Sequence, residues 1–353
     1  MFLKLALQTL ILTALCGAGG FLASLIHTPL PYMIGSLVAS GLIGIFFSDR
    51  LPEGYRFPMK FRMIFMALIG VMIGSRVHAD LIAEIPSLIA SLTVLTGFVF
   101  AAHGVNYVIF RHLGGYDRPT AFYSGTPGGL MESLALGEEA GADIPILTMQ
   151  QFMRIIAVIS IVPLGLSLYY GAPVGSAGGQ SMAAPDTSAA AIPLALAIGL
   201  AGLFIGTAIK LPAAQLTGPL LAAAIVTVTG LADLALPQWA INLSQVVIGT
   251  SLGMRFTGLR GRTMVVAAGL AVVSVTAMLG LGALCATALH SATGAPFDAL
   301  LISFAPGGVT EMALIALSLH ANPAIVTLHH VYRIILTVIE MSVIGRFRRA
   351  KQL

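Results

Sequence analysis

The chain has 353 residues, of which 57% are apolar and only 9% are charged, with 18 Lys and Arg against 14 Asp and Glu. A soluble domain carries about 25% charged residues, so this composition excludes a cytosolic enzyme, a secreted disulfide scaffold and a disordered chain. Ten to twelve helical crossings of about 20 residues each would use about 200 to 240 residues, which leaves only short loops. We therefore predict an all-α, polytopic membrane protein.

Twelve apolar stretches follow one another along the chain. They cover residues 5–26, 30–47, 62–75, 85–110, 119–137, 145–169, 191–209, 214–235, 240–254, 263–289, 296–319 and 323–345. The first is predicted to be a membrane helix rather than a signal peptide, because apolar runs continue to the end of the sequence. Residues 171–190, rich in Gly, Ala, Ser and Pro, are typical of a linker. We expect a first membrane repeat over 1–170 and a second over 191–353.

The two halves carry an internal duplication. A fixed shift of 179 residues aligns residues 69–76 with 248–255 and gives 11 identities over the 33 positions from 124 to 156. Chance does not produce such a match, so the gene contains a duplication. The aligned Gly-x-x-x-Gly pairs, Gly70/Gly74 and Gly249/Gly253, predict that neighbouring helices approach closely at these positions.

The placement of Lys and Arg predicts the orientation of the halves, since cytoplasmic loops collect positive charge. With an odd number of crossings per half, 15 of these 18 residues fall inside and only Arg76 falls outside, while Arg154 and Arg333 lie within apolar helices. An even number places 11 inside and five outside. We therefore predict two inverted-topology repeats of about five crossing helices each, in the inner membrane, with both termini cytoplasmic.

The Pro-Gly-Gly-x-x-Glu motif occurs once in each half, at residues 127–132 and 306–311. Pro and Gly interrupt a helix, and a new helix that starts within the membrane points free N–H groups and partial positive charge at what precedes it. Such an end suits an anionic solute. We expect this stretch to be a re-entrant hairpin; alternatively it crosses as a broken helix, and stretches such as 62–75 and 240–254 are partial.

Ionisable side chains lie close to both motifs. Glu132 and Glu311 fall in the first turn of the new helix, where a carboxylate either caps the helix or binds a coupling proton or cation. Arg154 and Arg333 lie about 13 Å into their helices, near the middle of the membrane, and each requires a partner. That partner is either one of these glutamates or an anionic substrate held bidentately.

Polar residues beside the arginines complete the predicted site. Gln150 and His329 each lie one turn before an arginine, and Gln151 and His330 flank the same helix face. The predicted solute-binding residues are Ser124, Gly128, Gly129, Gln150, Arg154, Ser303, Gly307, Gly308, His329 and Arg333, with Glu132 and Glu311 as ion-coupling residues.

Other chemistries lack the residues that they need. The histidines are too scattered for a copper or iron centre, and the absence of a phosphate-loop motif excludes ATP hydrolysis by this chain. The longest basic loop, residues 48–60, is too short for a DNA-binding domain. We predict no catalytic residue, metal, cofactor or direct nucleic-acid contact, and therefore no enzyme. The expected partners are the lipid bilayer and a small-molecule or ion substrate, and a homo-oligomer is compatible with the sequence.

The duplicated motif resembles one known family. Two copies of Pro-Gly-Gly-x-x-Glu, each followed 16 to 22 residues later by Thr and Arg, are similar to the duplicated AbrB membrane family over nearly the whole chain. Members carry labels such as regulator of gene expression and ammonia monooxygenase, and the residues here support neither activity. The plan is also similar to cation/proton antiporters and bile-acid-type symporters, which is an analogy of fold.

These features predict a secondary transporter of a small anionic solute across the inner membrane, with its site at the repeat interface between the two Pro-Gly-Gly breaks. The alternative is a membrane-embedded sensor or regulator of gene expression that acts through a cytosolic partner.

Overall fold

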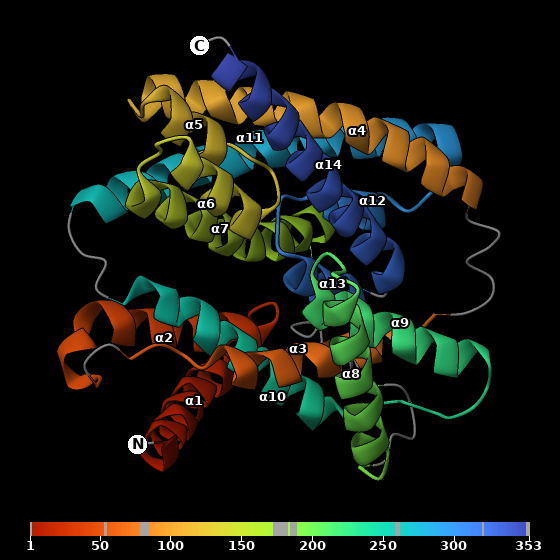
Figure 1. Ribbon diagram of the computed structural model, residues 1–353. Helices are drawn as coiled ribbons and strands as arrows, with labels where there is room; N and C mark the ends of the chain where they lie inside the picture. Colours follow the sequence, from red (N-terminus) through yellow and green to blue (C-terminus); the bar gives the residue numbers. More distant parts are fainter. Residues whose placement is uncertain are drawn as a thin grey trace. The chain divides into compact units, whose positions relative to one another are not determined.

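The computed structural model describes residues 2–52, 55–77, 85–171, 183, 189–257, 262–319 and 321–350. Every regular element in these ranges is a helix (Figure 1). The first half contains α1 (Phe2–Leu25), α2 (Pro31–Phe46), η1 (Ser48–Arg50), α3 (Met59–Gly74), α4 (Ile85–Val108), η3 (Ile109–Leu113), α5 (Arg118–Ser124), α6 (Leu130–Glu139) and α7 (Ile144–Tyr170). The second contains α8 (Ala191–Ala208), α9 (Ala214–Val228), α10 (Gln238–Gly253), η5 (Met254–Phe256), α11 (Arg262–Thr293), α12 (Phe297–Phe304), α13 (Val309–Ser318) and α14 (Pro323–Ala350). The predicted all-α fold is confirmed.

Six helices in the described part of the chain are long and apolar enough to cross a membrane. They are Leu5–Leu25, Leu88–Leu113, Ile144–Tyr170, Ala191–Ala208, Met264–Thr293 and Pro323–Ile344. Helices α2, α3 and α10 have 16 residues each, which corresponds to about 24 Å of length against a hydrocarbon core of about 30 Å. Three long helices therefore come from each half, as expected for a polytopic membrane protein.

The duplicated sequence folds into a repeated succession of helices. A shift of 179 residues carries the bounds of α3 onto those of α10 and the bounds of α6 onto those of α13. The same shift carries the first residues of α5 and α7 onto the first residues of α12 and α14. The Pro-Gly-Gly break therefore lies between the same two short helices in each half. Residues 171–190, the predicted linker, lie mostly outside the described residues.

The chain divides into two compact units, and each unit takes helices from both halves. Unit 1 is Met1–Leu81, Pro163–Arg260 and Ala313–Ala324, and it holds α1, α2, α3, α8, α9 and α10. Unit 2 is Ile82–Val162, Gly261–Met312 and Ile325–Leu353, and it holds α4, α5, α6, α11, α12 and most of α7 and α14. Division by packing thus differs from division by sequence repeat, and both breaks belong to unit 2.

Glycines bring helix backbones into contact within unit 1. Helix α3 packs on α9 and α10 packs on α2. A Cβ placed on Gly74 would overlap the Leu220 carbonyl on α9, and one placed on Gly253 would overlap the Leu37 carbonyl on α2. Because no side chain fits between these backbones, the helices cross at close range. The packing role predicted for the Gly-x-x-x-Gly pairs is confirmed.

The first break lies in a segment of unit 2 that folds back on itself. The Asp117 carboxylate caps α5 by accepting a hydrogen bond of 2.8 Å from the Thr120 N–H. The Thr120 hydroxyl in turn accepts one of 2.8 Å from the Asp143 N–H, which lies beyond the end of α6. Helices α5 and α6 have 7 and 10 residues, too few to cross a membrane singly. The start of α5 and the residues that follow α6 therefore lie together, and the choice between a re-entrant hairpin and a broken crossing helix stays a prediction.

Candidate functional site

The two Pro-Gly-Gly breaks are short non-helical segments that belong to unit 2. Residues 125–129 join α5 to α6, and residues 305–308 join α12 to α13. Gly129 has φ 64° and ψ 53°, a left-handed conformation that glycine adopts without strain. Ser124 and Ser303, which lie at the ends of α5 and α12, are buried. The breaks thus place small residues, and peptide groups that lie outside regular helices, in the buried interior of unit 2.

Arg154 and Arg333 reach back from the following long helices to these breaks. Arg154 on α7 donates through Nη1 to the carbonyl of Thr126, and Arg333 on α14 donates through Nη1 to the carbonyl of Ala305. These carbonyls directly precede the prolines of the two motifs. Arg333 also donates through Nη2 to the Gly307 carbonyl at 2.8 Å. Both side chains are buried, with 6% and 1% of their surface exposed.

Carbonyl oxygens are thus the hydrogen-bond acceptors that the described residues offer to these two arginines. Of the two partners that the sequence left open, the carboxylates of Glu132 and Glu311 do not pair with Arg154 or Arg333 in this part of the chain. A buried cation is costly unless an opposite charge accompanies it. The arrangement therefore leaves two buried positive charges that an anion would neutralise.

The first break and the second arginine lie side by side. A Cβ on Gly128 would be 3.6 Å from Nε of Arg333 and 3.6 Å from Oγ1 of Thr337. Motif residues of one half and the arginine of the other therefore contribute to one electropositive region within unit 2.

Several buried polar atoms around the breaks have no hydrogen-bond partner among the described residues. They are Nε of Arg154, Nε of Arg333, Oγ of Ser124, Oε1 of Gln151 and Nε2 of His330. Native proteins leave few buried polar atoms unpaired, and each such atom requires an explanation. This group offers both donors and acceptors, so a polar ligand that carries negative charge would satisfy it.

Gln151 fixes the backbone of the first break. Its Nε2 donates to the carbonyl of Tyr123 at 2.9 Å and to the hydroxyl of Thr126 at 2.8 Å. The Thr126 hydroxyl also pairs with the Ser133 hydroxyl at 2.7 Å. Thr126 was not singled out from the sequence, although a polar residue directly before the motif proline was a signal that could have identified it.

Gln150 and His329 are buried but bond to other elements. Gln150 donates to the Tyr116 hydroxyl at 2.8 Å, and Nε2 of His329 pairs with the Ser91 hydroxyl on α4 at 2.7 Å. Burial raises the pKa of Tyr116, which precedes α5. Successive side chains on a helix point about 100° apart. The break is therefore contacted by the flanking Gln151, while the predicted Gln150 contacts Tyr116.

The two motif glutamates fold back toward the start of their own helices. Oε2 of Glu132 would lie 3.4 Å from a Cβ on Gly129, and Oε2 of Glu311 occupies the place that a Cβ on Gly308 would take. A glutamate at the third position of a helix reaches back in this way in a capping box, and the helix dipole favours its charge. This geometry supports the capping role over the ion-coupling role.

The sequence alone did not identify a buried pair between α4 and α14. Nδ1 of His103 on α4 lies 2.9 Å from Oε1 of Glu340 on α14, and Nε2 of the same ring lies 2.9 Å from the Phe122 carbonyl. His103 and Glu340 are 2% and 7% exposed. An ionisable residue within an apolar stretch was the available signal, but the pairing spans 237 positions of sequence.

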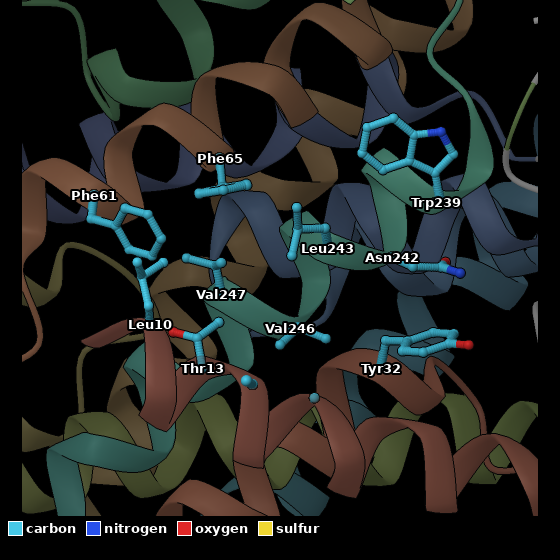
Figure 2. Close-up of a pocket in the computed structure, with 12 residues that line it drawn as sticks. Leu10, Thr13, Tyr32, Phe61, Phe65, Trp239, Asn242, Leu243, Val246 and Val247 are labelled. Atoms are coloured by element: carbon cyan, nitrogen blue, oxygen red, sulfur yellow. The ribbon is translucent and has the colours of Figure 1, made fainter. Parts of the chain in front are cut away.

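Unit 1 contains a cavity whose lining is uncharged. It measures about 550 Å³ and is lined by α1, α2, α3 and α10. Leu10 and Phe61 lie at one end, and Tyr32 and Trp239 at the other (Figure 2). None of its lining residues is charged, so it does not suit a small anion. Within the described ranges, no group of three or more His, Cys, Asp or Glu residues is placed to hold a metal ion.

Comparisons with known proteins place the chain in one family. The chain is 26% identical to "Uncharacterized protein YhjN" of Bacillus subtilis (strain 168), over 94% of this chain and 91% of the relative. It is 23% identical to "Putative regulator AbrB" of Escherichia coli (strain K12), over 93% of this chain and 92% of the relative. The family described as "Transition state regulatory protein AbrB" matches residues 42–349. The resemblance noted in the sequence is confirmed: this chain belongs to the AbrB family.

Proposed function

We propose that this protein is a secondary transporter of a small anionic solute, which binds between the two Pro-Gly-Gly breaks. The observation that carries the proposal is the pair of buried arginines. Arg154 and Arg333 are buried, donate to backbone carbonyls and keep Nε without a partner in the described residues. An anion placed against the guanidinium groups would balance their positive charge and accept the free N–H groups.

The breaks supply the remaining polar groups of the proposed site. Ser124 contributes a buried hydroxyl that is unpaired among the described residues, and at Gly128 no side chain occupies the space beside Nε of Arg333. Broken helices around a polar site are the usual construction of secondary transporters, because unwound backbone is tolerated only where protein or water surrounds it. The proposal places the site near mid-membrane, in an inner membrane, with both termini in the cytoplasm.

The direct test is binding of anions to the purified protein. Sodium acetate, succinate, citrate and phosphate would be compared at equal ionic strength, with sodium chloride as the reference. A ligand of the native state raises the unfolding temperature by mass action, so at least one anion is expected to raise it. The same anion, radiolabelled, is then expected to enter proteoliposomes that contain the protein. Absence of both effects for all four would contradict the proposal.

Arg111 provides a matched control. It also donates to a backbone carbonyl, that of Tyr116, at 2.6 Å, but it lies in η3, outside the residues of both breaks. R111K should bind the anion like the wild type. R154K and R333K should bind it more weakly, because an ammonium replaces a planar fork with a point charge.

The alternative function is regulation of gene expression, which the printed name of the E. coli relative suggests. The two functions can be distinguished by expressing variants in cells that lack the gene. If the protein acts by transport, R154K and R333K should fail to restore the wild-type expression pattern. Full restoration by variants that carry no flux would favour a regulator that acts through a cytosolic partner.

A further inference from the structure

We propose that His103 and Glu340 together form a proton-binding site, and that this proton is the coupling ion of the transporter proposed above. The pair lies in unit 2, where it joins α4 to α14. The coupling role rests on the proposed function, whereas the proton site itself rests on the geometry of the pair alone.

The hydrogen-bond partners of the ring fix how many protons the pair holds. Nε2 of His103 faces the Phe122 carbonyl, which can only accept, so Nε2 carries a hydrogen. Nδ1 faces Oε1 of Glu340 at 2.9 Å, a contact that requires one proton between the two atoms. The pair is either imidazolium with carboxylate or imidazole with carboxylic acid. Both forms contain the same number of protons. If the two ring nitrogens were assigned the other way round, the number of protons would be the same, because each nitrogen would still face an oxygen that can accept.

Release of this proton would break one of the two contacts of the ring. A neutral imidazole keeps a single N–H, which it can donate to Oε1 of Glu340 or to the Phe122 carbonyl but not to both. The nitrogen left bare would then face an acceptor at hydrogen-bonding distance, which is repulsive. The proton would pass to water. His103 thus joins α14 to α5 only while the proton is bound.

The pair is joined to the candidate anion site through two elements. Glu340 lies seven residues after Arg333 on α14, or about 10 Å along the same helix face. Phe122, which accepts from His103, is two residues before Ser124 at the start of the first break. Movement of α14 away from α4 on proton release would therefore displace Arg333. This is a physical connection between the proton and the anion.

The duplicated half shows that the fold does not need this pair. The positions that correspond to His103 and Glu340 under the shift of 179 are Gly282 and Ile161. A Cβ on Gly282 would lie 3.2 Å from Cβ of Phe304, so apolar atoms fill the equivalent space. A polar pair present in one half only indicates a single proton site.

Other titratable or charged groups occur on the elements that pack around the pair. They include Tyr107 on α4, Arg118 and Tyr123 on α5, Glu132, Glu138 and Glu139 on α6, Arg154 on α7, Cys285 and His290 on α11, and His329, His330, Tyr332 and Arg333 on α14. Of these, the histidines and the glutamates ordinarily titrate between pH 4 and 8. The test must therefore separate His103 and Glu340 from these groups.

The variant E340Q makes this separation with a minimal change. The amide that this substitution introduces can donate to Nδ1 of a neutral His103 at any pH, so it replaces the shared proton with a fixed hydrogen. In the unfolded chain histidine is neutral above a pH of about 6.5, whereas under the proposal the two acceptors that face the ring keep the proton in the folded wild type. The folded state then binds one proton more, so wild-type stability falls as pH rises, by about tenfold in the unfolding equilibrium per pH unit.

The measurement is the unfolding temperature of purified protein between pH 6.5 and 9. The wild type should lose stability over this range, and E340Q should lose clearly less. The double variant H112Q/E138Q, which makes the same residue changes at exposed positions of unit 2, should follow the wild type. An equal pH dependence in wild type and E340Q would overturn the proton site.

A second measurement does not depend on unfolding. Histidine labelled with ¹⁵N reports the protonation of each ring nitrogen, and H103Q identifies the signals of His103 by their loss. At pH 7.5, Nδ1 of His103 should carry or share a proton in the wild type. A bare Nδ1 without a hydrogen bond would contradict the proposal.

The coupling role is tested with succinate and a pH-sensitive dye enclosed in proteoliposomes. Wild-type protein should change the internal pH as succinate enters, while E340Q should exchange succinate without a pH change. Succinate flux with no pH change in the wild type would overturn coupling and leave the transporter intact. Failure of the four anions to bind would overturn the transporter, whereas the proton site is decided by the first two measurements.

Discussion

Gly128 and Arg333 lie in contact, although they belong to different halves of the duplicated sequence: a Cβ on Gly128 would be 3.6 Å from Nε of Arg333. The electropositive region is therefore assembled from both halves, and neither half could form it singly. Because position 128 is glycine, no side chain fills the space beside Nε of Arg333.

Replacement of the two adjacent motif glycines should have different effects. In G128A the new methyl group makes ordinary van der Waals contact and covers Nε of Arg333, so anion binding should weaken while stability is kept. Gly129 has φ 64°, so G129A should lower the free energy of unfolding by about 1 to 2 kcal/mol. Denaturant unfolding and anion titration of the two variants provide the check. Equal losses of stability would show that position 128 is also conformationally restricted.

Replacement of either arginine by lysine should lower anion affinity while leaving the yield of folded protein nearly unchanged. R154K and R333K keep the positive charge but lose the fork that can bind an anion and a carbonyl together. Hydrogen bonds to charged groups contribute about 1.5 to 3 kcal/mol, so anion affinity should fall about 10- to 100-fold. Calorimetric titration measures this loss, and yield after detergent extraction serves as the folding control. A structural ion pair with Glu132 would instead predict that R154Q is rescued by E132Q, and the carbonyl partners of Arg154 argue against that rescue.

The motif glutamates should behave as helix caps. E132Q and E311Q remove a charge that the helix dipole favours, which should lower the free energy of unfolding by about 0.3 to 1 kcal/mol each. Glu138 provides a control of opposite sign, because it lies in the last turn of α6, where the dipole disfavours a carboxylate. E138Q should be neutral or slightly stabilising. Loss of gradient-driven uptake in E311Q, with exchange kept, would instead assign ion coupling to the glutamates.

The predicted membrane topology can be tested with reporter fusions. If each half crosses an odd number of times, a reporter inserted after Ser176 should lie in the periplasm and one at the C-terminus in the cytoplasm. An alkaline phosphatase fusion is active only outside the cytoplasm and a fluorescent protein mainly inside. Both reporters on the same side would contradict the inverted arrangement of the repeats.

The duplication was the most informative feature of the sequence, because it predicts element boundaries as well as similarity. The same shift that aligns the motifs also aligns α6 with α13 residue by residue. Local chemistry explains this success, because the consecutive Pro and Gly residues of each motif interrupt the helix at the same place in both halves. The close approach of helices at Gly74 and Gly253 was predictable for the same reason.

Contacts between distant segments were not predictable in this way. Helix periodicity places Gln150 and Gln151 on nearby faces, and only packing decides that Gln150 contacts Tyr116 while Gln151 contacts the break. The same is true of His103 and Glu340, which lie 237 positions apart. Nothing local to either residue specifies the other, since their pairing depends on how α4 and α14 pack.

The glycine crossings of unit 1 also have a consequence for which substitutions the chain can accept. At each crossing glycine a methyl group would overlap backbone atoms of the neighbouring helix, so even alanine should be rejected. A saturation screen that scores only folded, membrane-inserted protein through a fluorescent fusion would need no knowledge of the solute. It should find almost no permitted replacement at Gly70, Gly74, Gly249 and Gly253, and many at Gly97, Gly104, Gly269 and Gly280, where nothing lies within 4 Å of the added atom.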